Sequence, residues 1–186
     1  MNLIGRKVIL RAIEEEDLEL FRNMLNSPEL ENLIVPWYLP ISQKDQCEWF
    51  KNTKNNLNHI RYVIALKEND KAIGTIGLFN IDWKNGYVYG TGIRIFENNY
   101  RKQGIGYDSL MTLLKYAFEE LRLNRIDFEA LANNNASINL YLKAGFKREG
   151  LKRKMIYKNG QFNDVVIGGC LKTDYEEKLK KSLLDR

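Results

Sequence analysis

The sequence predicts an α+β fold, in which helices pack against one mixed and mostly antiparallel sheet. Two observations predict this class. The chain has 186 residues, of which 44% are apolar, and this is enough for one core in one domain. Its segments follow the order strand, two helices, three antiparallel strands, helix, strand, helix and hairpin. We therefore expect residues 1–186 to form a single domain.

The N-terminal half should contain a strand, two helices and three further strands. Apolar alternation predicts the first strand at Val8–Arg11, and helical spacing of apolar residues predicts a helix over Glu14–Asn26. Pro28 should end that helix, and Ser42 should cap a second helix that extends to Leu57. The three strands are expected at residues 61–67, 72–81 and 87–96, with turns at 68–71 and 84–86.

The C-terminal half should continue with a parallel crossover. The strand–helix–strand unit from Tyr87 to Ala132 should be right-handed, with its two strands parallel. The expected segments are a helix at 108–121, a strand at 125–132, a helix at 137–143, hairpin strands at 154–157 and 164–171 around a turn at 158–161, and a tail helix at 173–184.

A glycine-containing turn, Arg101-Lys102-Gln103-Gly104-Ile105-Gly106, joins the long central strand to the helix that follows it. Free backbone N–H groups and the positive end of the helix dipole face outward at such a helix N-terminus, so the turn favours a phosphate. The two glycines allow close approach to the backbone, and the basic residues favour an anion. The turn lacks the pattern of a nucleotide P-loop and the third glycine of a dinucleotide-binding fingerprint.

A second segment, residues 134–146, follows the next strand and reads NNASINLYLKAGF, a capped helix closed by glycine. Together the two segments resemble the GNAT superfamily of acetyl-CoA-dependent N-acetyltransferases. Its pyrophosphate loop has the pattern [RQ]-x-x-G-x-[GA], and its second cofactor segment has N-x-x-[SA]-I-x-x-Y-x-K-x-G-F. Residues 10–17, 42–50 and 159–164 further resemble the branch that contains the ribosomal-protein N-terminal alanine acetyltransferases and spermidine N-acetyltransferase.

The resemblance implies a GNAT fold whose two central parallel strands splay apart, with the pantetheine of acetyl-CoA inserted between them. It implies CoA as product. The cofactor-binding residues that it implies are the backbone of Arg94, Ile95 and Phe96, the loop Arg101, Lys102, Gln103, Gly104, Ile105 and Gly106, and the side chains of Asn134, Ser137 and Tyr141.

The resemblance also implies two catalytic residues. Tyr141 matches the tyrosine that protonates the CoA sulfur, although a core aromatic that anchors the helix is the other interpretation. Glu129 aligns with a carboxylate that acts as a base through water, and an exposed strand glutamate is its alternative. Thr91 departs from the branch, in which many members have a glutamate there. By strand alternation, Tyr87 and Tyr89 should share the face of Thr91.

The acceptor should be a primary amine, either a peptide N-terminus or a small molecule. Trp37, Tyr38 and Trp49 are candidate walls of its pocket. A polyamine would favour the acidic run 14–17, but such a run also complements a helix dipole. The competing class is a non-catalytic acyl-CoA-binding sensor or scaffold, which would keep the cleft and lack turnover.

Composition excludes several other classes. The net charge is +5, with 29 basic and 24 acidic residues interleaved, so no nucleic-acid partner is expected. No apolar run approaches the roughly 18 residues of a membrane span, and we expect a cytoplasmic protein. Cys47 and Cys170 should be buried hydrophobes, and no metal-ligand spacing is present. The basic cluster at residues 143–158 is either a solvated face or a surface that attracts the phosphates of CoA. The chain is also a possible homodimer.

Overall fold

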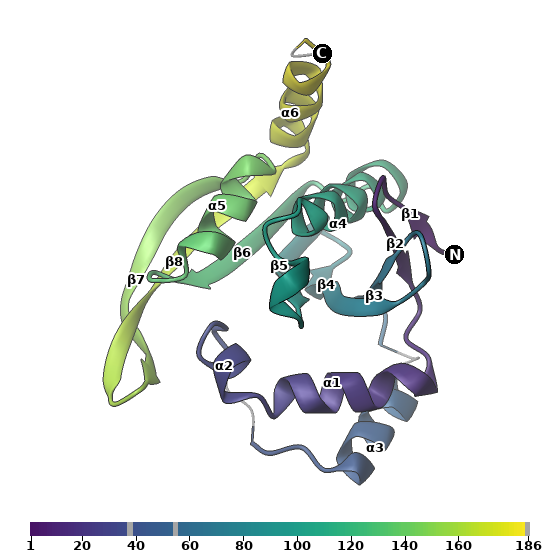
Figure 1. Ribbon diagram of the computed structural model, residues 1–186. Helices are drawn as coiled ribbons and strands as arrows, with labels where there is room; N and C mark the ends of the chain where they lie inside the picture. Colours follow the sequence, from purple (N-terminus) through teal and green to yellow (C-terminus); the bar gives the residue numbers. More distant parts are fainter. Residues whose placement is uncertain (37–38, 54–55, 185–186) are drawn as a thin grey trace.

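The structure is a computed structural model that describes residues 1–36, 39–53 and 56–184 (Figure 1). Within these residues one eight-stranded sheet has the order β1-β2-β3-β4-β5-β6-β8-β7. The pair β5–β6 is parallel and the other pairs are antiparallel, which confirms the predicted α+β class. The strands are β1 (Leu3–Ile4), β2 (Val8–Arg11), β3 (His59–Leu66), β4 (Ala72–Asp82), β5 (Tyr87–Ile95), β6 (Arg125–Leu131), β7 (Lys147–Lys158) and β8 (Gln161–Leu171).

The helices pack on both faces of this sheet. They are α1 (Leu18–Leu25), α2 (Pro28–Glu31), α3 (Gln43–Thr53), α4 (Ile105–Lys115), α5 (Asn135–Lys143) and α6 (Lys172–Leu184). The main core lies between the sheet and α4 and α5, and a smaller one forms where Phe21 of α1 meets Val63 and Ala65 of β3. None of the described helices combines the length and apolar character that crossing a bilayer requires.

Several boundaries differ from the sequence prediction, and three of these differences have a clear physical reason. Pro28 begins a short helix instead of only ending one, because proline suits the first helical turn. The helix predicted from Asp108 begins at Ile105, directly after Gly104, whose left-handed backbone ends the loop. Strand β7 begins at Lys147 instead of residue 154. Most of β7 is exposed at the edge of the sheet, so its sequence carries no apolar alternation to reveal it.

Strands β5 and β6 pair for only part of their length. Val88 is opposite Ile126 and Thr91 is opposite Phe128, while residues 92–95 of β5 continue to pair with β4 alone. At the same level β6 pairs with β8. The two parallel strands therefore diverge after Thr91, which gives the splayed pair that the resemblance implied. We call the region between the diverging strands the splay, and the point at Thr91 where they separate its vertex.

The pairing also corrects one prediction about side-chain direction. Ile126 and Phe128 both face the main core, so their partners Val88 and Thr91 face it too, although they are three residues apart. The extra residue is a bulge in β5. Tyr87 and Tyr89 pack on each other with ring centroids 4.3 Å apart, on the opposite face. The expectation that they share the face of Thr91 is wrong, because alternation does not continue through a bulge.

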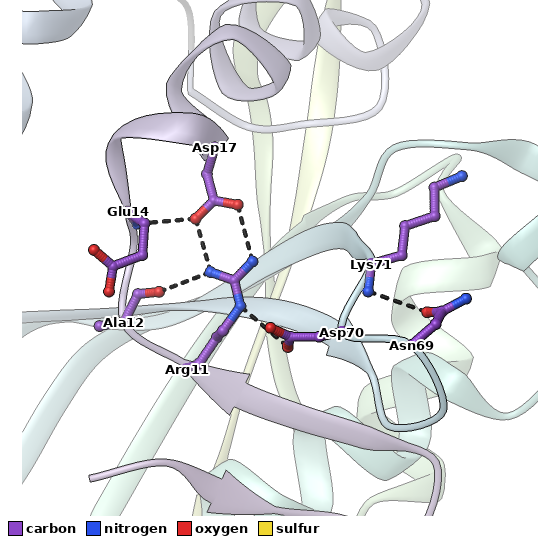
Figure 2. Close-up of polar contacts among 7 residues, drawn as sticks. All are labelled: Arg11, Ala12, Glu14, Asp17, Asn69, Asp70 and Lys71. Atoms are coloured by element: carbon purple, nitrogen blue, oxygen red, sulfur yellow. Dashed lines mark hydrogen bonds and ion pairs between the residues drawn. The ribbon is translucent and has the colours of Figure 1, made fainter.

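Arg11 of β2 fixes the position of the first helices (Figure 2). Its guanidinium donates to both carboxylate oxygens of Asp17, at 2.8 and 3.0 Å, and to Asp70 in the β3–β4 turn at 3.3 Å. Asp17 is buried and also accepts from the backbone N–H of Glu14. This part of the acidic run 14–17 therefore orients α1 against the sheet instead of facing an acceptor.

Candidate active site

The N-terminus of α4 leaves backbone N–H groups that could bind an anion. Gly104 caps it with φ of 80°, and the first bond within the helix runs from the N–H of Asp108 to the carbonyl of Gly104, at 2.9 Å. The N–H groups of Ile105, Gly106 and Tyr107 precede that bond, so the helix ladder does not use them. Residues 102–104 are exposed. A phosphate could therefore reach this turn, and its binding there stays a prediction.

Basic side chains surround the same turn. Lys7 donates from its ammonium to the carbonyl of Gln103 at 2.7 Å, and the ammonium of Lys143 lies 5.1 Å from the ring centroid of Tyr107. Asp108 accepts N–H groups of Arg6, Lys7 and Val8 at 2.7 to 3.2 Å, which holds the β1–β2 turn beside α4. Sequence reasoning missed Lys7 because this contact joins segments about a hundred residues apart.

The backbone groups of Arg94, Ile95 and Phe96, which were predicted to bind pantetheine, are not equivalent in the structure. The carbonyl of Ile95 accepts from the guanidinium of Arg101, at 3.2 and 3.4 Å, so it faces away from β4 and toward the splay. Phe96 instead donates its backbone N–H to Ile73 at 3.0 Å, and this donor is committed to the β4 side. Arg94 is paired with Thr75 of β4, and against the effect of burial its positive charge lowers the pKa of the Tyr141 phenol.

Tyr141 of α5 lies at the vertex where β5 and β6 separate. Its hydroxyl donates to the carbonyl of Thr91 at 3.0 Å, and its ring stacks on Phe128 with centroids 4.4 Å apart. The side chain is 2% exposed. Burial raises the pKa of the phenol, and the charge of Arg94 opposes part of that rise. Tyr141 is therefore a neutral phenol whose hydroxyl donates a hydrogen bond at this vertex.

The other two residues of the second cofactor segment are held by the start of α5. Asn134 is its N-cap and accepts the N–H of Ser137 at 3.1 Å, while its amide donates to the carbonyl of Leu33 at 2.9 Å. Ser137 is half-buried and lies one helical turn before Tyr141. Asn134 thus has a structural role, and its contact with Leu33 joins α5 to the segment after α2.

Glu129 and Thr91 are both engaged by neighbours. The carboxylate of Glu129 pairs with the ammonium of Lys152 of β7 at 2.5 Å. The Thr91 hydroxyl is buried and donates to the carbonyl of Gly77 at 2.8 Å. A base role for Glu129 stays a prediction.

A hollow of about 260 Å³ lies between α1, α3 and the sheet. Its lining is mostly apolar: Phe21, Met24, Leu25, Ile41, Asp45, Gln46, Trp49, Arg61 and Thr75. Thr75 of β4 is the neighbour of Arg94 on β5, so the hollow adjoins the splay. Hydrogen bonds from the hydroxyl and backbone N–H of Ser42 lower the pKa of Asp45. Trp49 lines this hollow, and its role as a wall of the acceptor pocket stays a prediction. Trp37 and Tyr38 lie outside the described residues.

These features fit acetyl-CoA. The unused N–H groups and the basic side chains at α4 suit phosphates, the Ile95 carbonyl suits an amide donor of pantetheine, and the Tyr141 hydroxyl lies at the inner end of the splay. Each part comes from a separate element, and the fold brings them together where β5 and β6 diverge.

Comparison with known proteins agrees with this geometry. The family model described as "Acetyltransferase (GNAT) domain" matches residues 7–147. The SPbeta prophage-derived uncharacterized N-acetyltransferase YokL of Bacillus subtilis is 30% identical over 172 residues, which cover 92% of this chain and 94% of YokL. The uncharacterized N-acetyltransferase p20 of Bacillus licheniformis is 29% identical over 176 residues, 94% of this chain and 98% of p20.

A solved structure shares the fold. The spermidine N-acetyltransferase from Vibrio cholerae, in complex with CoA and spermine, superimposes with a TM-score of 0.83 at 22% identity, over 91% of this chain and 98% of that one. The chain therefore belongs to the GNAT family of acetyltransferases, which use acetyl-CoA to acetylate an amine.

Proposed function

We propose that this N-acetyltransferase acetylates a primary amine, on a peptide N-terminus or a small molecule, and that Tyr141 protonates the departing thiolate. The observation that carries the proposal is the position of the Tyr141 hydroxyl at the vertex of the splay. Acetyl-CoA supplies the acetyl group as a thioester. The residues of this chain bind that cofactor, bring the amine to it and handle the protons.

We propose that the backbone N–H groups of Ile105, Gly106 and Tyr107 bind the pyrophosphate, within the loop 101–106. Lys7 adds positive charge beside Gln103 of that loop. The Ile95 carbonyl is the acceptor available to a pantetheine amide once the Arg101 guanidinium turns toward phosphate. Arg94 and Ser137 remain proposed contacts of the cofactor near Tyr141. Phe96 and Asn134 contribute to cofactor binding through the shape of the site.

The hydroxyl of Tyr141 donates to the peptide carbonyl of Thr91. Because burial raises the pKa of this phenol, it stays protonated over the working pH range. A thiol has a pKa of only ~8.5, so full transfer of a proton from this phenol to a free thiolate is uphill. The hydroxyl therefore acts by donating a hydrogen bond to the sulfur as the C–S bond breaks, and a proton that passes to the sulfur is replaced from solvent. This is general acid catalysis.

The amine must lose a proton before it attacks, and Glu129 is the proposed base through a water molecule. Its ion pair with Lys152 holds the carboxylate in one position on β6. Glu129→Gln should lower kcat/KM for the amine by at least ~10-fold. An unchanged rate at pH 7 would leave Glu129 as a structural partner of Lys152.

The hollow beside Thr75 is the proposed acceptor pocket. Its apolar lining suits an amine on an apolar body, and the Asp45 carboxylate suits the ammonium form that arrives from water. A panel of N-terminal peptides, alkyl and aryl amines and amino acids, assayed for CoA release, tests the proposal. Release above the hydrolytic background with none of them would favour the sensor class instead.

A polyamine is the second candidate acceptor. A groove of about 730 Å³ between α1 and α3 is lined by Glu15, Glu16 and Glu19, together with Arg22 and Lys51. Its carboxylates favour a cationic substrate. Spermidine and spermine in the same panel separate the two candidates, because Asp45 and the α1 glutamates lie in different hollows.

A homodimer and a cytoplasmic location complete the proposal. Strand β7 is an edge strand with exposed Leu151, Met155 and Tyr157, and such an edge can pair with a second copy. Cys47 and Cys170 form no disulfide, which suits a reducing compartment. Mass measurement in solution and cell fractionation test these two points.

A further inference from the structure

The sheet face on the side of α1 and α3 carries a row of three residues at the level of the vertex. Arg61 of β3 pairs with Gly77 of β4, and Gly77 pairs with Gly92 of β5. Apolar residues next to them in the chain pack against the main core, so the row faces α1 and α3 instead (Figure 1). Gly92 directly follows Thr91, so the row ends beside the vertex.

The two glycines of this row leave room for the ring of Phe79, which is also on β4. A Cβ at Gly77 would lie 2.9 Å from that ring, and a Cβ at Gly92 would lie 3.2 Å from it. The ring therefore occupies the space that two side chains would take. Apart from the chain neighbours of Gly92, no other described residue comes within 4 Å of its Cβ position. The floor beside the vertex thus consists of backbone and one aromatic ring.

Arg61 stands between this floor and the hollow beside Thr75. Its guanidinium carbon lies 5.0 Å from the ring centroid of Phe79 and 5.4 Å from that of Trp49 on α3. A cation is attracted to the face of a ring, and such a contact uses none of its N–H groups as a hydrogen bond would. Arg61, Trp49 and Thr75 all line the hollow. The guanidinium is thereby held where the hollow meets the floor.

The hollow has charges of both signs. Asp45 supplies a carboxylate, and Arg61 supplies a cation that keeps its proton at any working pH. The rest of the lining is apolar except for Gln46 and Thr75. The volume of about 260 Å³ lies below the range of roughly 300–1,000 Å³ that is usual for ligand pockets. A matching ligand is therefore small and zwitterionic, with an apolar body.

A second arginine adds positive charge to the same face. Arg94 alternates along β5 with Ile93 and Ile95, which pack against the main core, so its side chain starts on the side of α1 and α3. It pairs with Thr75, so Arg61 and Arg94 lie on the two strands that flank β4. Like charges repel and opposite charges attract. This part of the face therefore disfavours a polyamine and favours an acceptor with an anionic group.

We propose that Arg61 binds a carboxylate of the acceptor, and that the acceptor is an amino acid with an apolar side chain. The planar fork of a guanidinium matches a carboxylate through two parallel N–H···O bonds, and stacking on rings keeps that fork in place. The carboxylate itself does not react, and its position directs the amine across the glycine floor toward the vertex. The inference rests on the proposed function for its kinetic part. Binding of a carboxylate at Arg61 does not depend on turnover.

The test uses three compounds that differ in one group. Phenylalanine has both amine and carboxylate, its amide replaces the carboxylate as a peptide bond would, and phenylpropanoate lacks the amine. Assays of CoA release compare the first two, and calorimetry on the protein with CoA measures binding of the third. Each is run with the wild type, Arg61→Met and Arg122→Met. Arg122 is an exposed arginine before β6 and outside the lining of the hollow, so it is the matched control.

In the wild type, kcat/KM should be at least ~10-fold higher for phenylalanine than for its amide. Arg61→Met should lower kcat/KM for phenylalanine at least ~10-fold and change that for the amide less than ~3-fold. It should also weaken the binding of phenylpropanoate at least ~10-fold. CoA affinity should be equal in all three proteins, and Arg122→Met should behave as the wild type throughout.

A wild-type preference for the amide, or for panel amines that lack a carboxylate, would overturn the proposal. Equal losses for phenylalanine and its amide in Arg61→Met would overturn it too. If Arg61→Met does not fold, Arg61→Lys carries the same comparison, because lysine keeps the charge and loses the planar fork.

The binding measurement separates this proposal from the proposed function. A wild-type protein that acetylates no amine of the panel, yet binds phenylpropanoate through Arg61, contradicts the proposed function and supports the carboxylate site. Phenylpropanoate that does not bind, or that binds Arg61→Met as tightly as the wild type, overturns the site whatever amine is acetylated.

Discussion

The hydroxyl of Tyr141 lies 3.0 Å from the carbonyl oxygen of Thr91, at the level where β5 and β6 stop pairing. A helix residue thereby bridges the closed end of the splay. The hydroxyl satisfies a buried carbonyl, and it lies where the proposed function places the sulfur of CoA. The first prediction follows from this contact.

Tyr141→Phe keeps the ring that stacks on Phe128 and removes the hydroxyl. We expect kcat to fall by about 10²-fold or more, with cofactor affinity nearly unchanged. Tyr175→Phe is the matched control, because Tyr175 is also buried and donates to Glu119 at 2.9 Å. An equal loss of kcat in both variants would assign Tyr141 to packing.

Gly104→Val should weaken CoA binding. Gly104 has φ of 80°, a conformation that β-branched residues rarely adopt, and its side chain would point toward the approach of a phosphate. We expect at least ~10-fold weaker binding by calorimetry. Gly160→Val is the control, since Gly160 has φ of 76° and open space around it. It shares the backbone strain without touching the loop 101–106, so equal effects would contradict the site.

Lys7→Met should reduce the electrostatic part of CoA binding. Its ammonium bonds the Gln103 carbonyl inside the loop. We expect several-fold weaker binding, roughly 3- to 10-fold at low salt, and a smaller dependence on ionic strength. Lys44→Met, an exposed lysine of α3, should leave both unchanged. A salt dependence equal to that of the wild type would remove Lys7 from the site.

The rate should rise with pH from about 6 toward 9, because the attacking amine must be neutral and an alkylamine has a pKa of ~10.4. Burial raises the pKa of Tyr141, so the phenol keeps its proton across this range and its contribution is not lost there. A pH–rate profile that falls above pH 8 would show that an essential acid titrates earlier, and would contradict Tyr141 as the donor.

Asp45→Asn should raise KM for the amine about 10-fold and leave kcat nearly unchanged. The asparagine keeps the shape that pairs with Ser42 and removes the charge from the hollow. Glu48→Gln on the same helix, outside that lining, is the control. Equal KM values for the two variants would mean that the amine binds elsewhere, for example in the groove lined by Glu15, Glu16 and Glu19.

The fold and the cofactor loop could be predicted from sequence because their signals are local. Apolar spacing marked β3–β5 and α4, and Gly104 has the left-handed φ that its turn requires. Ser42 caps α3 through a reciprocal bond with Asp45, as its sequence spacing suggests.

The remaining features depend on contacts distant in sequence. Lys158 is one of many lysines in its strand, and only the fold shows that it is buried against Glu31. Lys7 reaches Gln103, and Asn134 reaches Leu33, in the same way. The bulge between Val88 and Thr91 reverses the side-chain alternation. Gly90 lies within it, and a strand glycine often marks a bulge, but the expectation from alternation did not use this signal.

The account depends most on one claim, that acetyl-CoA lies in the splay with its sulfur beside Tyr141. A crystal structure of the protein with CoA measures this directly. We expect the pyrophosphate on the N–H groups of Ile105, Gly106 and Tyr107, and the sulfur within hydrogen-bond distance of the Tyr141 hydroxyl. CoA bound elsewhere, or a sulfur separated from Tyr141 by another side chain, would contradict the account.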